Sequence, residues 1–397
     1  MRERGILCAH MRELSSLSLL PTQRLYTPGP LSTTPTVKAA MLRDLGSRHA
    51  SFLRIVSEIR SEILELAGVD REEWAVLPLP GSGTYGLEAV LGNAVSEEKC
   101  VLIIANGAYG DRLAQIAAGL SVEHLVLRFP ESKPFDSAKI LSLIQDCPQL
   151  THLAVVQCET STGQVNELRA ILRLAQSLKL SVIVDAMSSF GAVPLDLGSS
   201  PIDYLVTSPN KCLQGVPGCS LLLLRRSALY ECSSRSYSLD LGAHLSMLDS
   251  SGQFRFTPPT HALLALHQAL RELRQEGGPA KRYQRYKTNA EVLGEGMSRL
   301  GFVPLFGKEH LSPIISSFFY PDDPAFSFPL FCHLLSERGF VIYPGKLSTS
   351  DCFRIGTIGN LFPSDMTDLV SAIEQVLQEM KVAMPTRGTP SPQTTVP

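Results

Sequence analysis

Short apolar segments alternate with helix-like stretches over residues 76–224, and this alternation restricts the fold more than any other feature of the sequence. Seven segments have the length and the branched residues of buried strands. They are 76–79, 101–105, 124–129, 152–158, 180–184, 204–207 and 220–224. Repeated strand–helix–strand units predict an α/β fold with a mainly parallel, seven-stranded sheet.

The 397 residues leave room for two domains. A helical stretch at 259–276 ends at Gly277-Gly278-Pro279, and strands are predicted beyond it near 302–306, 314–320, 341 and 353. We expect a large domain over 25–276 and a smaller C-terminal α+β domain over 277–383. Residues 1–24 are interpreted as a disordered leader and 384–397 as a disordered tail.

Composition argues against several classes of function. Hydrophobic residues make up 44% of the chain, charged residues 19%, and the net charge is −2, so neither a nucleic-acid partner nor a membrane partner is expected. Nine scattered cysteines predict reduced thiols of a soluble intracellular protein, with the cytoplasm favoured. A mitochondrial presequence is the alternative, although Glu3 and Glu13 count against it. The sequence has no HExxH, GK[ST] or GxSxG motif, so we expect no metal site, Walker loop or hydrolase triad.

Two of the predicted strands end in residues that suit a pyridine-ring cofactor. Asp185 ends the strand at 180–184, and a carboxylate in that place needs a cation to offset its burial. The protonated ring nitrogen of pyridoxal phosphate is such a cation, and Met187 would pack against the ring. Lys211 follows the next strand among small and apolar residues, where desolvation favours covalent attachment of the cofactor. Taken singly, the aspartate is more often a cap residue and the lysine a solvated surface group.

Two further strand ends carry candidate cofactor ligands. Gly81-Ser82-Gly83-Thr84 joins a strand to a helix, so its N–H groups and hydroxyls suit a phosphate; a tight connection without a ligand is the alternative. Tyr109 follows the strand at 101–105, where it would either stack on a pyridine ring or pack against the sheet.

Thr160 and Arg354 are candidates with equally open alternatives. Thr160 follows the strand at 152–158, where it would hydrogen-bond the ring hydroxyl of the cofactor or cap a turn. Arg354 lies in an otherwise apolar strand and matches a phosphonate or carboxylate; a structural ion pair is its alternative role.

Six blocks of sequence resemble the fold-type I, class V aminotransferases that use pyridoxal phosphate, and among them those acting on 2-aminoethylphosphonate and pyruvate. The blocks are GSGTYGLEA, NGAYGDR, DAMSSFGA, SPNKCLQGVPG, RFTPPTHALLA and YPGKLSTSDCFRIG. The resemblance runs from about residue 25 to about residue 380. It departs at 43–49, where tryptophans would be expected, and residues before 25 have no counterpart.

The resemblance implies a role for each candidate. Lys211 would hold the cofactor, Asp185 its ring nitrogen, and Tyr109 would stack on the ring, with Thr160 nearby. Ser82, Gly83 and Thr84 would bind the phosphate together with Asn210 and with Thr257 of a second subunit, which implies a homodimer. Arg354 and the backbone of Gly29 would bind the substrate.

The implied reaction converts 2-aminoethylphosphonate and pyruvate to phosphonoacetaldehyde and L-alanine, a step of phosphonate catabolism. An alanine or serine aminotransferase with glyoxylate or pyruvate as acceptor is one alternative. A non-catalytic binding or scaffold protein with the same fold is the other.

Overall fold

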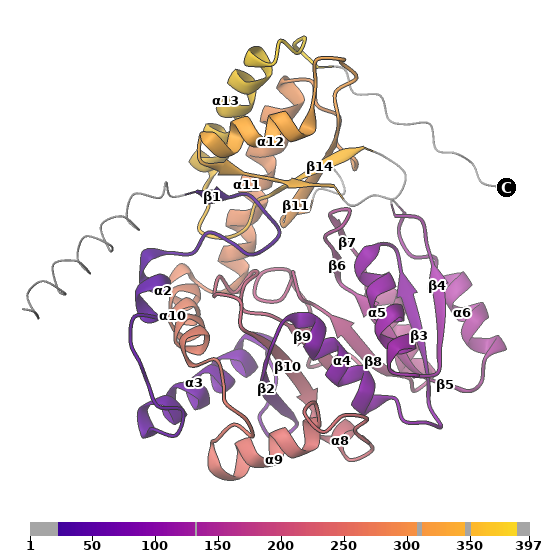
Figure 1. The fold of residues 1–397 in the computed structure, drawn as a ribbon. Coiled ribbons are helices and arrows are strands. Elements are labelled where there is room, and N and C mark those ends of the chain that lie inside the picture. Colours follow the sequence, from indigo (N-terminus) through magenta and orange to yellow (C-terminus); the bar gives the residue numbers. More distant parts are fainter. Residues whose placement is uncertain (1–22, 132, 308–311, 346–350, 387–397) are drawn as a thin grey trace, which may run out of the picture.

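The structure is a computed structural model that describes residues 23–131, 133–307, 312–345 and 351–386. A larger part is built around a seven-stranded sheet, and a smaller part, formed mainly by the C-terminal third of the chain, lies against one end of it (Figure 1). Most of the predicted leader and of the predicted tail lies outside the described residues.

The seven predicted strands form one sheet, as the sequence indicated. They are β2 (Trp74–Pro80), β3 (Cys100–Ala105), β4 (His124–Arg128), β5 (Leu150–Val156), β8 (Ser181–Asp185), β9 (Ile202–Thr207) and β10 (Cys219–Arg225). Their order is β2-β10-β9-β8-β5-β3-β4, and only β10 runs antiparallel to its neighbours. The prediction of a mainly parallel α/β sheet is confirmed. Because the other six strands run the same way, their carboxyl ends meet at one edge.

Helices surround this sheet and enclose the larger hydrophobic core. Helix α4 (Gly83–Ala94) packs against strands β9 and β10. Helix α5 (Ala108–Gly119) packs against strands β3, β4 and β5. The remaining helices of the larger part are α2 (Pro35–Ala40), α3 (Ala50–Ala67), α6 (Ser137–Asp146), α7 (Arg169–Ser177), α8 (Arg226–Leu229), α9 (Leu241–Ser251) and α10 (Thr260–Glu276). Helices α4 and α5 each begin directly after a strand, so their N-termini lie at the edge where the strands end.

The strand predicted at 152–158 begins and ends two residues earlier than expected. Strand β5 ends at Val156, and a separate small hairpin follows, with β6 (Cys158–Glu159) paired to β7 (Gln164–Val165). Gly163 allows the reversal because it adopts φ +98°, and its N–H donates to the carbonyl oxygen of Glu159. Thr160 therefore lies in a hairpin turn beside the sheet.

The smaller part has its own sheet and core. Strands β11 (Ile315–Phe319), β14 (Cys352–Gly356) and β13 (Tyr343–Pro344) form an antiparallel sheet. It packs with helices α11 (Pro279–Arg299), α12 (Phe328–Glu337) and α13 (Pro363–Glu379) around a phenylalanine-rich core. The expected strand at 302–306 is reduced to an isolated bridge between Pro304 and Phe318, since proline has no N–H to extend a ladder.

The N-terminal segment joins the smaller part. Strand β1 (Arg24–Leu25) pairs with β12 (Phe340–Val341), and the buried Tyr26 belongs to the smaller core. The domain boundary near residue 276 stays a prediction. Residues 24–26, which precede that boundary in the chain, hydrogen-bond to residues 339–341, which follow it.

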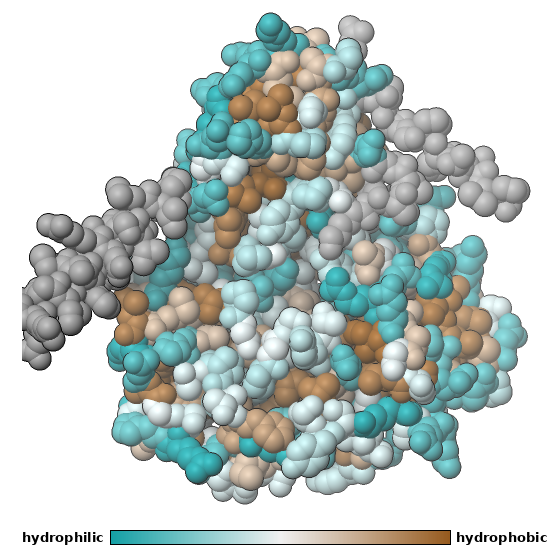
Figure 2. All heavy atoms as spheres, in the orientation of Figure 1, coloured by the Kyte–Doolittle hydropathy of each residue, from teal (hydrophilic) through white to brown (hydrophobic). Residues whose placement is uncertain are grey.

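No helix of the described residues is long and apolar enough to cross a bilayer. On the face drawn in Figure 2, hydrophobic residues form separate patches among hydrophilic ones.

Candidate active site

A cavity of about 200 Å³ opens where strands β2, β8 and β9 end. Most residues predicted for the site lie on its wall: Ser82, Gly83, Thr84, Tyr109, Asp185, Met187, Asn210 and Lys211. A larger hollow of about 570 Å³ lies beside α7, but no lysine lines it. The tertiary structure thus brings together groups from four separate strand ends.

Lys211 enters the cavity from the loop after β9. Its Nζ donates a 2.6 Å hydrogen bond to the carbonyl oxygen of Pro28. Burial lowers the pKa of this amine, while the charges of Tyr109, Cys212 and Asp185 act in the opposite direction. Gly29, which does not line the cavity, lies against the same side chain: a Cβ atom added there would be 2.6 Å from Nζ.

Asp185 is a buried carboxylate without a strong counter-charge. It is 4% exposed, and burial raises its pKa from 3.8 to about 6, although a 2.9 Å hydrogen bond from the N–H of Met187 lowers it. Within the described ranges, no basic nitrogen lies within 4.0 Å of its carboxylate. The cation that the sequence led us to expect beside Asp185 is therefore not a side chain of the described protein.

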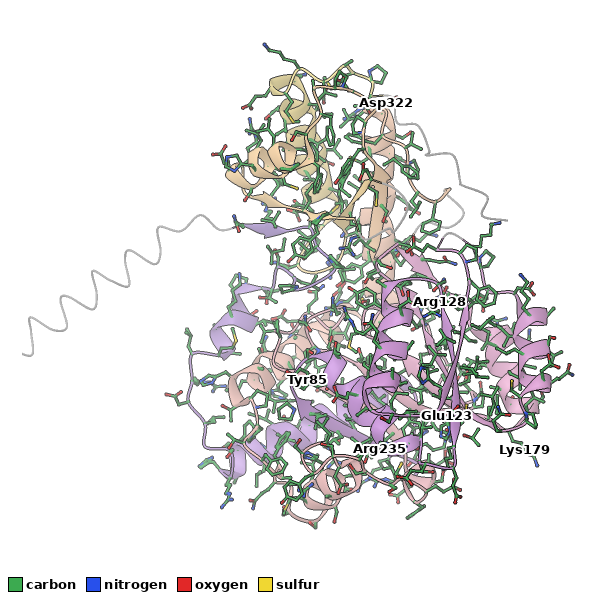
Figure 3. All side chains as sticks on the ribbon, turned by 45° about the vertical axis from the view of Figure 1, so that its right-hand side comes forward. Tyr85, Glu123, Arg128, Lys179, Arg235 and Asp322 are labelled. Atoms are coloured by element: carbon green, nitrogen blue, oxygen red, sulfur yellow. The ribbon has the colours of Figure 1, made fainter. Side chains whose placement is uncertain are left out.

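The N-terminus of α4 forms another wall. Ser82 is the N-cap residue but makes no side-chain capping bond, and the first N–H groups of any helix have no partner within it. A Cβ atom at Gly83 would lie 2.1 Å from Sδ of Met187, so a larger residue there would displace the Met187 side chain. Tyr85 is 54% exposed and lies at the surface (Figure 3). This end of α4 presents uncapped donors to the cavity, which suits an anion.

Two site residues escaped the sequence analysis. The guanidinium of Arg112 lies 4.8 Å from the ring centre of Tyr109 and also lines the cavity. The buried Glu159 carboxylate accepts hydrogen bonds from the N–H groups of Tyr109 and Gly110, at 3.1 and 3.2 Å. The i, i+3 spacing of Tyr109 and Arg112 on a predicted helix was the sequence feature that could have indicated their contact. No sequence feature indicated the role of Glu159, because its partners Tyr109 and Gly110 follow a different strand.

Thr160 and Arg354 meet just outside the cavity wall. Arg354 is 2% exposed and donates from Nη1 to the carbonyl oxygen of Thr160 at 2.7 Å and from Nε to that of Pro344 at 3.0 Å. Burial lowers its pKa, and a hydrogen bond with Tyr109 counteracts this. Among the described residues no carboxylate forms an ion pair with it, so the simple structural ion pair is not seen there.

Thr160 carries an unsatisfied hydroxyl. Its side chain is 1% exposed, and Oγ1 has no hydrogen-bond partner in the described part of the chain. A buried hydroxyl without a partner costs stability unless a ligand or water satisfies it. Thr257, by contrast, is exposed and does not line the cavity of its own chain.

Comparison with known proteins agrees with this arrangement. The sequence profile of the family described as aminotransferase class-V matches residues 34–349. A 2-aminoethylphosphonate–pyruvate transaminase of Aeromonas hydrophila is 45% identical over 355 residues, which cover 88% of this chain and 93% of that protein. A protein of the same name from Syntrophobacter fumaroxidans is 46% identical, with coverages of 89% and 96%.

Solved structures show the same fold. Alanine–glyoxylate aminotransferase from Nostoc superposes with a TM-score of 0.84 at 26% identity, covering 90% of this chain and 96% of that one. Pyridoxamine–pyruvate aminotransferase from Mesorhizobium loti gives a TM-score of 0.83 at 22% identity, with coverages of 92% and 94%. The chain belongs to the class V aminotransferase family and has its fold-type I architecture.

Proposed function

We propose that this protein transfers the amino group of 2-aminoethylphosphonate to pyruvate with pyridoxal phosphate as its cofactor, giving phosphonoacetaldehyde and L-alanine. The observation that carries the proposal is the placement of Lys211 and Asp185 on the wall of one cavity, beside the uncapped end of α4. Relatives about 45% identical over nine-tenths of the chain bear the name of this reaction.

The residues present fit pyridoxal phosphate. The Asp185 carboxylate has no side-chain cation in ion-pair reach among the described residues, and the buried hydroxyl of Thr160 lacks a partner. The N-terminus of α4 offers free donors for a phosphate. When bound, the cofactor would supply an electron sink for the charge that develops on the substrate carbon.

Each side chain then has a distinct task. Lys211 would hold the cofactor, and its amine would move a proton at the substrate carbon that bears nitrogen. Asp185 would keep the ring nitrogen protonated, and Tyr109 and Met187 would pack against the ring. Ser82, Gly83, Thr84 and Asn210 hold the phosphate.

Arg354 binds the acid group of the substrate, a phosphonate in one half-reaction and a carboxylate in the other. Its guanidinium is held by two carbonyl oxygens, which orient it without neutralising its charge. Residues 26–30 bend directly after β1 and are called the 26–30 turn. Gly29 lets the backbone of this turn approach the substrate beside Lys211.

A homodimer with shared active sites is part of the proposal. Thr257 is exposed, and its neighbour Phe256 is 42% exposed, so this segment is available to a second subunit. We also propose a cytoplasmic location, supported by the free thiols of Cys100, Cys147, Cys158, Cys212, Cys219, Cys232 and Cys332.

A half-reaction tests the proposal. Purified protein loaded with pyridoxal phosphate is mixed with 2-aminoethylphosphonate without acceptor, beside samples with alanine and with serine, and the absorbance of the lysine-bound cofactor is followed. Rapid loss of this band with the phosphonate, and release of phosphonoacetaldehyde, supports the assignment. A response to alanine or serine alone would transfer the protein to the alternative aminotransferase activity, and the absence of any cofactor band would favour a non-catalytic role.

A further inference from the structure

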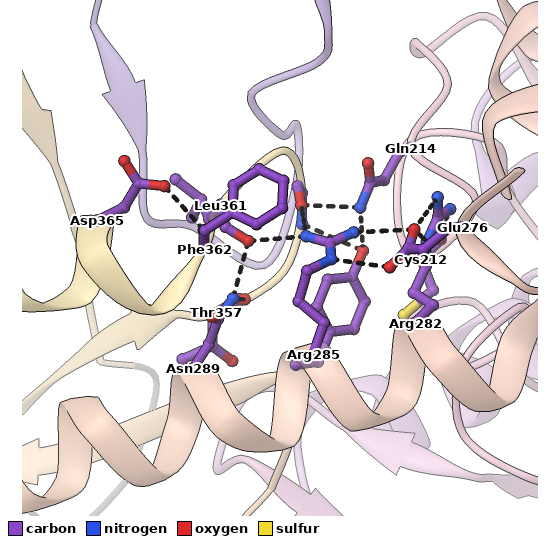
Figure 4. A network of polar contacts seen from close by, with 12 residues as sticks. Cys212, Gln214, Glu276, Arg282, Arg285, Asn289, Thr357, Leu361, Phe362 and Asp365 are labelled. Atoms are coloured by element: carbon purple, nitrogen blue, oxygen red, sulfur yellow. Dashed lines mark hydrogen bonds and ion pairs between the residues drawn. The ribbon is translucent and has the colours of Figure 1, made fainter.

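An ion cluster built on the buried Arg282 and the partly buried Glu276 and Arg285 lies at the junction of α10 and α11 (Figure 4). Glu276 ends α10, and the guanidinium groups of Arg282 and Arg285 both bind its carboxylate. Nε and Nη2 of Arg282 lie 2.9 and 2.7 Å from it, and Nε of Arg285 lies 2.8 Å from it. Arg282 is only 1% exposed, which makes it one of the largest fully buried side chains of the protein.

One branch of the cluster reaches the loop of Lys211. Nη1 of Arg282 donates to the carbonyl oxygen of Cys212, the residue directly after Lys211, at 2.9 Å. Gln214 bonds through Nε2 to the hydroxyl of Tyr286 at 2.6 Å and to the carbonyl oxygen of Gly359 at 2.7 Å. The backbone on the C-terminal side of Lys211 is therefore fastened to α11.

The other branch reaches the segment that follows Arg354. Nη1 of Arg285 donates to the carbonyl oxygens of Gly359 and Leu361, at 2.8 and 2.7 Å. Nδ2 of Asn289 donates to those of Thr357 and Leu361, at 2.9 and 3.0 Å. Residues 357–361 continue directly from β14, the strand that carries Arg354.

The end of β14 and the segment after it also hold the chain on both sides of the 26–30 turn. The N–H of Gly356 donates to the carbonyl oxygen of Tyr26, and the N–H of Asn360 to that of Ser32. Because Pro28 accepts the hydrogen bond from Lys211, these contacts close a ring that joins the lysine, the turn, the Arg354 strand and α11.

Fold stability alone is a weak reason for such a cluster. Buried ion pairs cost desolvation, and apolar residues of similar volume often stabilise a protein equally well. Here the guanidinium donors that do not bind Glu276 are directed at three carbonyl oxygens, all of them in the two segments that flank the site. Since guanidinium groups are planar, two such groups sharing one carboxylate fix both segments relative to each other.

We propose that Glu276, Arg282 and Arg285 form a positioning unit that sets the distance between Lys211 and Arg354. Arg282 acts through the carbonyl of Cys212 on the proton-transferring lysine, and Arg285 acts through residues 359–361 on the acid-binding arginine. The inference rests on the proposed function for the roles of these two residues. Neither Arg282 nor Arg285 contacts substrate.

The test compares Arg282→Gln and Arg285→Gln with Arg225→Gln. Arg225 is a matched control because it pairs with Asp203 at 3.0 Å and donates to the carbonyl oxygens of Ser200 and Ile202, at the opposite ends of the strands. All three variants are expected to lower the melting temperature. Only the two cluster variants are expected to change the site.

Arg282→Gln should slow the half-reaction with 2-aminoethylphosphonate by about 10-fold to 100-fold, the loss caused by a slightly displaced catalytic group, while KM changes little. It should also move the pH midpoint of the lysine-bound cofactor band by about one unit, because the surroundings of the amine change. Arg285→Gln should mainly raise KM for both substrates. The inference is overturned if both variants match Arg225→Gln in rate, KM and pH midpoint.

Two measurements keep the result decisive. If Arg282→Gln does not fold, Tyr286→Phe removes a single hydroxyl from the same network, and it should give a smaller change in the same direction. Amide hydrogen exchange of the cofactor-free protein should accelerate at 209–216 in Arg282→Gln, but not in Arg225→Gln. If the wild-type protein ignores 2-aminoethylphosphonate, the proposed function fails, whereas the exchange pattern and the pH midpoint still decide the inference.

Discussion

Nζ of Lys211 lies 2.6 Å from the carbonyl oxygen of Pro28, although 183 residues separate the two in the chain. The 26–30 turn thus lies against the side chain of Lys211, although none of its residues lines the cavity. Gly29 follows with φ +129°, a conformation that side-chain-bearing residues rarely adopt. The backbone approaches the lysine closely because this residue has no Cβ.

Gly29→Ala should impair the site more than the fold. The new Cβ would lie 2.6 Å from Nζ and 2.7 Å from Cδ of Lys211, so the lysine must move and activity should fall by about 100-fold or more. Gly68→Ala is the control: φ is +66° there, but nothing lies within 4 Å, so it should cost about 1 kcal/mol of stability and no activity. Equal specific activities of the two variants would contradict the placement of Gly29.

Lys211→Ala should abolish transamination and covalent cofactor attachment. The buried amine with a lowered pKa is the group suited to attach a carbonyl compound, whereas the exposed Lys287 is not. Borohydride reduction followed by mass spectrometry of peptides should place the cofactor on residue 211 in the wild-type protein and in Lys287→Ala. A label elsewhere, or normal turnover of Lys211→Ala, would refute the assignment.

Asp185→Asn should stabilise the cofactor-free protein at alkaline pH while abolishing activity. The folded pKa of about 6 lies above the ordinary 3.8, so ionisation of Asp185 costs the folded state about 3 kcal/mol above pH 6. The variant should therefore be more stable by about that amount at pH 8. Its advantage should shrink as the pH falls through 6 and vanish below about 4, where the carboxyl group is protonated in both states.

Urea unfolding of both cofactor-free proteins from pH 4 to pH 8 measures this difference. Asparagine keeps the oxygen that accepts from the N–H of Met187, so the comparison isolates the charge. A constant difference across this range would show that Asp185 is not held in the folded state with a raised pKa.

Arg354→Lys should weaken substrate binding more than turnover. Lysine keeps the charge but lacks the fork that bonds Thr160 and Pro344 and grips an acid group, so KM for both substrates should rise about 10-fold or more. Arg338→Lys, at an exposed pair with Glu379, should leave KM unchanged. Steady-state kinetics with each substrate varied in turn measures these KM values. An unchanged KM in Arg354→Lys would contradict the proposal that Arg354 binds the acid group of the substrate.

Several features could be predicted because they depend on local pattern. The seven apolar segments form the expected sheet, and residues at strand ends, such as Asp185 and Lys211, meet because parallel strands end at one edge. The hairpin that carries Thr160 was missed, since an apolar run does not reveal where a strand leaves its sheet. Arg112 and Glu159 were missed as well, because their importance lies in contacts with Tyr109.

The sequence by itself determined the class of fold, the family and the chemical character of the site, because hydrophobic periodicity and short motifs are properties of neighbouring residues. Only the tertiary structure decided that Pro28 faces Lys211, that Arg354 holds the Thr160 turn, and that Arg282 and Arg285 share Glu276. The first two contacts join segments that are distant in the chain. The third joins residues on the two sides of the tight connection between α10 and α11. Their geometry depends on how two separate cores pack, which no local pattern encodes.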